Sequence, residues 1–278
     1  AGSRAPLSTP WRQLNFLAEP AAGGTVTLIC GEPGSAKSFM LLQGFLFWHM
    51  RGIPVALTEL EKDRIYHLGR ALAMAEQCSW LARPRAIASA VAEQWRASWA
   101  NQRELLDSFG ARVFDQPAGR RIPLLDLLAR VRRQAESGCR AIGIDPVTAT
   151  QKGARSWDAD EDFMLGCVGI AARHGCTIWI VTHPRDNKGK PGLDNIAGGQ
   201  AYPRNADCVL WLTAHEPARK SMVQFMQDDS LAVSQYEHNA SVAMLKTRDA
   251  VGRKRALAMN FDGATLALHE LGVIVPQA

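Results

Sequence analysis

Short apolar runs alternate with longer amphipathic stretches along most of the chain. The apolar runs are rich in β-branched residues, which is typical of strands buried on both faces of a sheet. We predict such strands at residues 24–29, 53–58, 112–115, 141–147, 176–183, 208–212 and 241–245. The amphipathic stretches between them, such as 124–136, have the spacing of helices. This alternation predicts an α/β fold with a mostly parallel central sheet flanked by helices.

Three segments depart from the simple alternation. Residues 64–110 look helical and are longer than a crossover needs, so we expect a helical elaboration there. Within it, Trp95 and Trp99 share a helix face, and a core or subunit contact is favoured over a base-stacking platform. The polar stretch 148–162 is predicted to be a solvated loop before the next helix. Residues 215–239 have no clear period and are predicted to be an irregular, mobile insertion.

The two ends of the chain have their own patterns. Residues 1–22 are rich in proline and alanine and contain one amphipathic piece, 11–17, which packs on its own domain or on a neighbouring subunit of an oligomer. Two short strands within 256–268 bracket Asp262-Gly263, which predicts an antiparallel C-terminal hairpin. We therefore divide the chain into a lead-in, 1–22, and one large α/β domain, 23–278.

Composition narrows the class of protein only slightly. The chain is 47% hydrophobic and 21% charged, as in ordinary globular proteins. No apolar run reaches the roughly 18 residues of a membrane span, and the first residues have no signal-peptide pattern. The six cysteines lack metal-ligand spacing, which indicates buried small hydrophobes in a reducing compartment, so a cytoplasmic location is expected. A net charge of +5 permits a polyanionic partner.

The strongest chemical signal follows the first predicted strand. Residues 30–38, CGEPGSAKS, form a tight loop between a strand and a helix, and the spacing from Gly31 to Lys37 and Ser38 fits a P-loop. Backbone N–H groups there bind anions, and a lysine beside a hydroxyl suits phosphate with Mg²⁺. Ala36 replaces a glycine of the pattern, which matters if that position needs a positive φ. An ordinary turn is the alternative, but it does not need lysine and serine together. The predicted ATP-binding residues are Glu32, Pro33, Gly34, Ser35, Ala36, Lys37, Ser38 and Phe39.

Polar side chains also follow three other predicted strands, where open α/β sheets bind ligands. Glu61 is our candidate for orienting the attacking water. Glu59 is the second choice, because its side chain would point into the sheet. Either carboxylate could instead cap the next helix. Asp145 is predicted to hold Mg²⁺ together with Ser38. His183 is predicted to sense the γ-phosphate; the alternative is a hydrogen bond to a neighbouring loop.

Two groups of basic residues complete the set of candidates. The glycine-containing loop at 184–192 is expected to contact the phosphate backbone of a nucleic acid, although a solvated surface loop would have the same composition. Its cations are Arg185, Lys188 and Lys190. A second pair, Lys246 and Arg248, follows the strand predicted at 241–245.

The strand ends thus carry, in chain order, the P-loop, an acid, Asp145, His183, and Lys246 with Arg248. This order resembles the RecA-like motor domain of ring-shaped replicative helicases: the DnaB type, the phage and mitochondrial primase-helicases, and the small plasmid-encoded hexameric helicase. The resemblance covers about residues 25–268 and implies a RecA-like P-loop NTPase core.

The resemblance also implies roles for these residues. Lys37 and Ser38 would bind the phosphates and Mg²⁺, Glu61 would activate water, and Asp145 would support the metal. His183 would couple the γ-phosphate to a DNA-contacting loop at 185–199. Arg248 would be an arginine finger for the neighbouring subunit's ATP, with Lys246 as its companion. The implied catalytic set is therefore Lys37, Glu61, His183 and Arg248.

The function implied by the resemblance is an ATP-dependent DNA helicase or translocase. It would work as a homo-oligomeric ring, a hexamer, on single-stranded DNA in replication, with primase or other replication proteins as partners. Two other classes stay open: a RecA-type recombination or repair ATPase that forms filaments, and an ATP-switched assembly factor with slow turnover.

Overall fold

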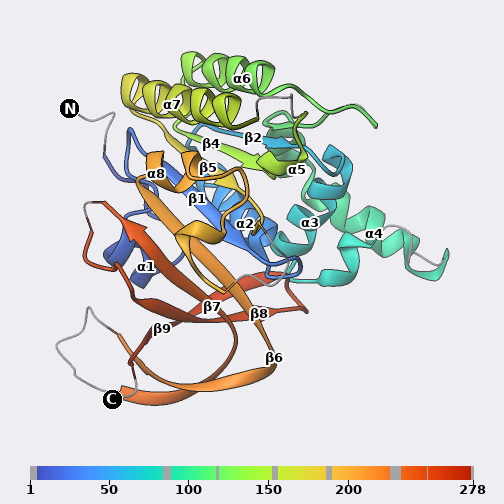
Figure 1. Ribbon diagram of the computed structural model, residues 1–278. Coiled ribbons are helices and arrows are strands. Elements are labelled where there is room, and N and C mark those ends of the chain that lie inside the picture. Colours follow the sequence, from blue (N-terminus) through green and yellow to red (C-terminus); the bar gives the residue numbers. More distant parts are fainter. Residues whose placement is uncertain are drawn as a thin grey trace.

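One twisted sheet organises the whole molecule (Figure 1). The computed structural model describes residues 5–83, 89–116, 119–151, 156–185, 190–225, 233–248 and 250–276. In this part of the chain nine strands form a single sheet, in the order β3-β2-β4-β5-β1-β6-β7-β8-β9. The first six strands in this order are parallel, and β7, β8 and β9 continue the sheet in antiparallel fashion.

The parallel strands are short and deeply buried. Their bounds are Val26–Gly31 for β1, Val55–Glu59 for β2, Val113–Phe114 for β3, Ala141–Asp145 for β4 and Thr177–Val181 for β5. Every residue of β1, β2, β4 and β5 is buried. Continuous apolar runs are what strands covered on both faces require. The predicted strands and the α/β fold are therefore confirmed, with boundaries that differ by a few residues.

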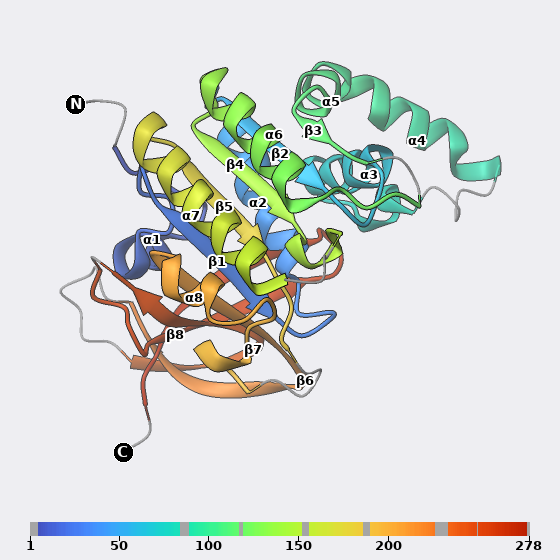
Figure 2. The same ribbon diagram turned by 45° about the horizontal axis from the view of Figure 1, so that its top comes forward.

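Helices cover both faces of this part of the sheet. Figure 2 shows α6 (Leu124–Glu136) and α7 (Ser156–His174) side by side on one face. The other face is covered by α2 (Lys37–His49), with α3 (Arg64–Ala75) and α5 (Arg103–Gly110) beside it. Successive residues of a strand point to opposite faces, so Ile29 joins the α2 cluster while Leu28 joins the α6–α7 cluster.

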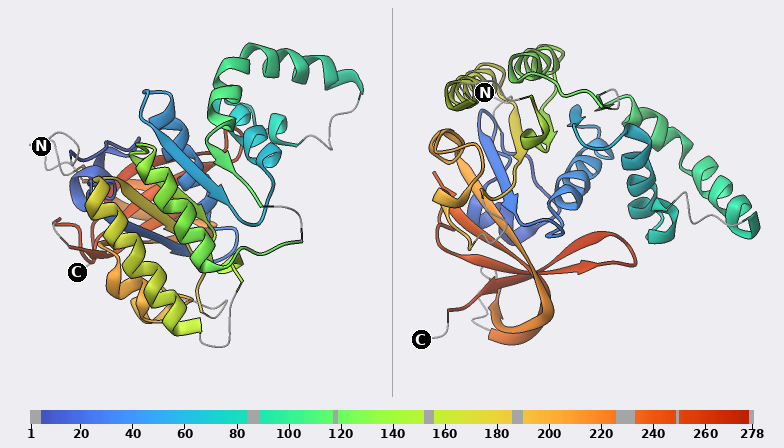
Figure 3. Two further views of the ribbon diagram at one scale, coloured as in Figure 1. Left: turned by 90° about the horizontal axis from the view of Figure 1, so that it is seen from above. Right: turned by 45° about the vertical axis from the view of Figure 1, so that its right-hand side comes forward.

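The helical elaboration forms an arm at the β3 end of the sheet. It contains α3, η2 (Ser79–Ala82), α4 (Ser89–Asn101) and α5, and α4 extends away from the body in Figure 3. Trp95 and Trp99 stack with ring centroids 5.0 Å apart, and Trp95 Nε1 donates to the Leu81 carbonyl at 3.2 Å. Both are half-buried against the core, so this pair makes intramolecular contacts.

The rest of the sheet has longer and more exposed strands. It begins with β6 (Cys208–Gln224), which runs parallel to β1 and antiparallel to β7, and continues with β7 (Val233–Thr247), β8 (Ala256–Asp262) and β9 (Ala267–Ile274); we call these four strands the antiparallel half. The last two form the predicted C-terminal hairpin, which is confirmed. Near its end β6 also pairs with β9, through Val223 and Gln224. The strands β6, β7, β8 and β9 are thus each paired with two of the other three, in a closed arrangement. Figure 3 shows β6 curling below the parallel strands.

Two sequence predictions are wrong here. Residues 215–224 and 233–239 are not irregular but are parts of β6 and β7. The alternation of apolar and polar residues that marks a strand is absent here, because most of these residues are exposed and because the pairing register shifts between Ala214 and Arg219. The polar stretch 148–162 is not all loop, since α7 begins at Ser156. Short elements fill the remaining connections: η4 (Val147–Ala149), η5 (Leu193–Asn195) and α8 (Ala201–Asn205).

The amphipathic piece of the lead-in forms α1 (Arg12–Ala18), which packs on the antiparallel half of its own chain. Trp11 Nε1 donates to the Leu268 carbonyl of β9 at 3.0 Å. The Glu270 carboxylate accepts from the backbone N–H groups of Gln13 and Leu14 at 2.7 and 3.0 Å. Gln43 of α2 also bonds both backbone groups of Leu268, at 2.8 and 3.2 Å.

Two further observations concern the class of protein. None of the described helices is both long and apolar enough to cross a membrane. All six cysteines are unpaired, and all but Cys78 are buried, as the sequence predicted for small hydrophobic residues.

Candidate nucleotide site

The loop between β1 and α2 has the backbone geometry of a phosphate cradle. Gly31 ends β1 with φ 154°, and a Cβ added there would lie 2.2 Å from the Leu212 carbonyl oxygen of β6, so only glycine fits. Lys37 is buried, and its Nζ donates to the Glu32 carbonyl at 2.7 Å and lies 3.3 Å from Ser35 Oγ. The ammonium therefore sits inside the loop, where a phosphate would also be held.

Ala36 does occupy a backbone position that needs a positive φ. Its φ and ψ are 68° and 18°, in the left-handed region, immediately before α2. A residue with a Cβ is strained there by about 1 kcal/mol. The replacement of the P-loop pattern's glycine by alanine therefore has an energetic consequence in this loop.

The oxygen ligands predicted for Mg²⁺ meet at the start of α2. The Ser38 hydroxyl donates to the Asp145 carboxylate, which lies buried at the end of β4. Burial, together with the nearby carboxylate of Glu59, raises the pKa of Asp145 to about 7, and the Ser38 hydrogen bond opposes this shift. A hydroxyl and a carboxylate beside a phosphate cradle suit Mg²⁺, which takes few protein ligands. The residues present therefore fit the ion.

Glu61 and His183 meet beside the P-loop. Glu61 follows β2 and is exposed, and its Oε1 lies 3.9 Å from Nε2 of His183, which follows β5. Burial and the charge of Lys37 lower the pKa of His183, while Glu61 opposes this. Both side chains thus reach the edge of the sheet that also carries Lys37. Their roles in hydrolysis remain predictions.

Glu59, the alternative to Glu61, lines the same small cavity as Glu61 but is buried. It is 2% exposed and its Oε2 lies 3.0 Å from Nε2 of His67 on α3. Burial raises the pKa of Glu59 and lowers that of His67 to about 4, so both groups favour their neutral forms. Glu59 is also the register partner of Asp145. This geometry favours Glu61 over Glu59 as the residue that faces solvent and substrate.

Sequence reasoning missed a group on α3. The Arg70 guanidinium lies 4.3 Å from the ring centroids of both Phe39 and Tyr66, and Phe39 lies 5.0 Å from Phe261 of β8. Arg70 also donates to the Tyr66 hydroxyl. Arg70, Tyr66 and His67 line a cavity of about 110 Å³ next to Ser38 and Asp145. No signal in the sequence ties α3 to the P-loop, because the contact depends on helix packing.

The basic loop after β5 is anchored at its base. Arg185 and Lys190 are exposed, whereas Lys188 lies outside the described residues. Ala197 N–H donates to the His183 carbonyl at 2.9 Å, and Arg185 N–H donates to the Asn195 carbonyl at 2.7 Å. The backbone of His183 is thus bonded to the loop, while its side chain faces Glu61.

Lys246 and Arg248 lie near the amino-terminal ends of the parallel strands, whereas the P-loop follows the carboxyl end of β1. We refer to these two ends of the parallel strands as the two edges of the sheet. Thr247 pairs with Cys208, which pairs with Thr27, four residues before Gly31 and therefore about 13 Å from it along β1. Arg248 Nη1 bonds Asp207 Oδ1 at 2.8 Å, and half of the Arg248 side chain is exposed. Lys246 Nζ donates to two carbonyls at the end of α8, each at 2.9 Å. Neither cation reaches the P-loop of its own chain.

A P-loop after β1, an acid after β2, an acid at the end of β4 and a histidine after β5 define an α/β nucleotide-binding protein. The pattern of the AAA domain family matches residues 7–189, more than half of the chain. The chain belongs to this family. A search of curated protein sequences finds no match.

Solved structures with the same fold include an ATPase domain and a replicative helicase. The ATPase domain has a TM-score of 0.64 and 14% identity, over 89% of this chain and 84% of that one. The second structure is a DnaB-like replicative helicase described with its interactions with primase. Its TM-score is 0.70 at 12% identity, over 95% of this chain and 62% of that one. The RecA-like fold expected from the sequence is confirmed.

Proposed function

We propose that the protein is the ATP-driven motor of a ring-shaped, DnaB-type DNA helicase that moves single-stranded DNA. The observation that carries the proposal is the division of the candidate residues between two edges of the sheet. Lys37, Glu61 and His183 meet at one edge, whereas Arg248 lies half-exposed at the other. Subunits arranged head to tail would bring these two edges together.

At the P-loop edge the residues would divide the work of hydrolysis. Lys37 would leave its bonds to the loop and offset charge on the β- and γ-phosphates of ATP. Glu61 would orient the attacking water, since it is the exposed carboxylate of the β2 end. His183 would contact the γ-phosphate, and its backbone bond to Ala197 would carry the change to the basic loop. Mg²⁺ held by Ser38 and Asp145 would neutralise part of the phosphate charge.

At the opposite edge Arg248 would reach the ATP of the neighbouring subunit. The Arg248 side of its ion pair with Asp207 is half exposed, so the guanidinium is accessible to a second anion, and Asp207 would keep the hydrogen bond from Val26 N–H. Lys246, which caps α8 in the single chain, would support the same phosphate. The ring would be a homo-oligomer, a hexamer by the resemblance, and primase or other replication proteins would be its partners.

The loop that contains Arg185, Lys188 and Lys190 would contact the phosphate backbone of single-stranded DNA. Arg185 and Lys190 are exposed, and the loop is bonded to His183 at its base. Its position would therefore respond to the γ-phosphate. This coupling would turn hydrolysis into movement of the strand.

The test is the steady-state ATPase rate with and without oligothymidylate at fixed salt, for the wild-type chain and Glu61→Ala. We expect DNA to stimulate the wild-type rate. Glu61→Ala should lower kcat by about 10²–10⁴ while nucleotide still binds. Glu136→Ala, which removes an exposed carboxylate at the far end of α6, is the matched control and should behave as wild type.

Two other outcomes would reject the motor. Weak turnover that DNA does not change would favour an ATP-switched assembly factor. DNA-stimulated turnover with filaments in place of rings, seen by electron microscopy with ATP, would favour a recombination ATPase.

A further inference from the structure

A second opening lies beside Glu61, on the β3 side of the nucleotide site. It is a pocket of about 850 Å³ whose walls come from three loops. The loop after β2 supplies Leu60 to Asp63, the loop after β3 supplies Gln116 and residues 119–121, and the loop after β4 supplies Thr148 and Ala149. These are carboxyl ends of parallel strands, the usual place for ligands in such sheets.

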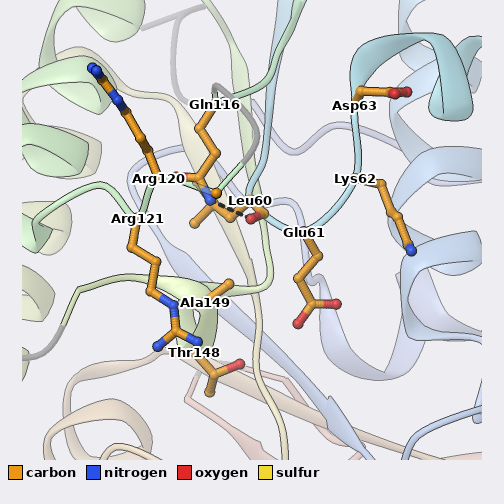
Figure 4. Close-up of a pocket in the computed structure, with 10 residues that line it drawn as sticks. Leu60, Glu61, Lys62, Asp63, Gln116, Arg120, Arg121, Thr148 and Ala149 are labelled. Atoms are coloured by element: carbon orange, nitrogen blue, oxygen red, sulfur yellow. Dashed lines mark hydrogen bonds between the residues drawn. The ribbon is translucent and has the colours of Figure 1, made fainter.

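Two consecutive arginines give the pocket its chemistry. In Figure 4 the Arg121 side chain extends along the wall toward Thr148, and Arg120 points outward at the rim. Neither has an ion pair or hydrogen bond with any of the described residues. A guanidinium group matches the geometry of phosphate oxygens better than any other side chain. With no partner among the described residues, Arg121 is therefore free to bind a phosphate in the pocket and Arg120 to bind one at its rim.

Thr148 supplies a polar atom that needs a partner. Its Oγ1 is buried and has no hydrogen-bond partner among the described residues. A buried hydroxyl without a partner costs free energy. Because the oxygen itself is not exposed, a phosphate oxygen held by Arg121 would bond it only after the Thr148 side chain turns toward the pocket.

The loop that carries the arginines is held on both sides. Gln116 Nε2 donates to the Leu60 carbonyl, and Gln116 Oε1 accepts from Ile122 N–H at 3.1 Å. Gln151 N–H donates to the Ile122 carbonyl at 2.9 Å, next to the bridge between Pro123 and Gln151. The pocket is therefore built between fixed points on the loops after β2 and β4.

The position of the pocket favours a polymer over a single anion. Along the sheet, β3 and β5 are three strands apart, or about 14 Å. Arg120 and Arg121 follow β3, Thr148 follows β4, and the basic loop that begins at Arg185 follows β5. An extended polyanion would cross all three. None of the described residues that line the pocket is aromatic, so contact would be with the nucleic-acid backbone rather than by stacking on bases.

We propose that this pocket binds the backbone of single-stranded nucleic acid, with one phosphate at Arg121 and Thr148 and a neighbouring phosphate at Arg120 on the rim. The inference rests on the proposed function and extends its DNA path to the loop between β3 and α6. Because Glu61 lines the same pocket, a bound strand would lie directly beside the residue proposed to orient water. Binding of the nucleic acid would then be coupled to ATP hydrolysis through Glu61 in this pocket as well as through His183.

The test compares two double variants of the full chain in the presence of a non-hydrolysable ATP analogue. Binding of fluorescent oligothymidylate is measured by anisotropy over a range of salt concentrations. R120A/R121A should reduce the slope of log K against log salt by about 0.7 for each phosphate that no longer binds a cation. R132A/R133A removes the same charge from the exposed face of α6 and should leave the slope unchanged. Thr148→Val should weaken binding about twofold to tenfold.

Each contrary outcome has its own meaning. Equal slopes for the two double variants would reject the proposed phosphate site and leave the proposed motor function unaffected. Altered assembly in sedimentation, with the slope unchanged, would mean that another subunit fills the pocket. A third outcome is that free phosphate displaces the oligothymidylate far better than chloride does at equal ionic strength, and only when Arg120 and Arg121 are present. The site would then bind small anions instead. If the wild-type chain hydrolysed ATP but bound no strand, the proposed function itself would fail.

Discussion

The parallel and antiparallel halves of the sheet differ in both construction and chemistry. Strands β1, β2, β4 and β5 are five or six residues long and wholly buried. Strands β6 and β7 are 17 and 15 residues long, and much of their length is exposed. The first half carries the P-loop, Glu61, Asp145 and His183. The second carries Lys246 and Arg248, at the other edge.

This difference suggests that the two halves serve different partners. The parallel half has the rigid frame that a nucleotide site needs, because its side chains are locked by packing on both faces. The antiparallel half presents its cations outward, toward another molecule. A functional site would then consist of one half from each of two subunits, and experiments that separate the two contributions can test this division.

The largest expected effect is that of Arg248→Ala. If its guanidinium acts on the neighbour's ATP, the ATPase rate should fall by about 10³–10⁵, with nucleotide binding retained. Mixing this variant with Glu61→Ala should restore activity, because some interfaces then combine an intact Glu61 with an intact Arg248. The measurement is the ATPase rate as a function of the mixing ratio.

The control for this experiment is Arg253→Ala, an exposed arginine in the turn between β7 and β8, which should hydrolyse ATP normally. If the mixture stays inactive while both variants still assemble, the division of the site between subunits is wrong. Near-wild-type activity of Arg248→Ala alone would also reject the idea.

A smaller effect concerns the stability of the antiparallel half, which should fall at acidic pH. His215 of β6 lies beside Arg219 and His238, and burial together with these charges lowers its pKa to about 4. An unfolded histidine has a pKa near 6.5, so between pH 6.5 and 4 only the unfolded chain binds this proton. Stability is therefore lost as the pH falls through this window. Because His215 is only half-buried, we expect about 1 kcal/mol.

The measurement is the change in Tm between pH 7 and pH 5. It should be smaller for His215→Gln than for the wild-type chain, while His269→Gln, at an exposed position of β9, serves as the control. The same acid sensitivity in all three proteins would show that the histidine cluster does not limit the stability of the antiparallel half.

The smallest effect concerns the parallel half itself. Ala36→Gly should remove left-handed strain at the start of α2, offset in part by the greater chain entropy of glycine. We expect a net gain of about 0.5 kcal/mol, measured by denaturant unfolding. Gly34→Ala, at φ 80°, is the converse variant and should destabilise the chain. If Ala36→Gly lowered the stability, the strain inferred from the backbone would be absent.

The sequence predicted the parallel half well and the antiparallel half poorly, for a physical reason. Strands buried on both faces must be apolar throughout, and this leaves a clear pattern at residues such as 141–145. Most of β6 beyond Leu212 and the first half of β7 face solvent, so nothing in the sequence constrains them. The early start of α7, at Ser156, was missed because its first turns are polar.

For the candidate site, the residues at strand ends could be predicted from the sequence, but those that helices bring in could not. The P-loop, Glu61 and His183 could be found because β strands place their ends at a common edge. His67 and Arg70 were missed, because their approach to Asp145 and Phe39 depends on how α3 packs. The pocket with Arg120 and Arg121 was missed for a similar reason: three loops distant in sequence form it.

The closure of β6 onto β9 also limits how copies of this chain can associate. An open strand at the end of a sheet can recruit a strand from another molecule and so lead to aggregation. Here β9 pairs with both β8 and β6, and the Gln43 and Trp11 side chains bond the backbone of Leu268. The other end of the sheet is β3, only two residues long. Continuous sheets across subunits are thus disfavoured, and any ring must be held by side chains and loops that can separate and re-engage.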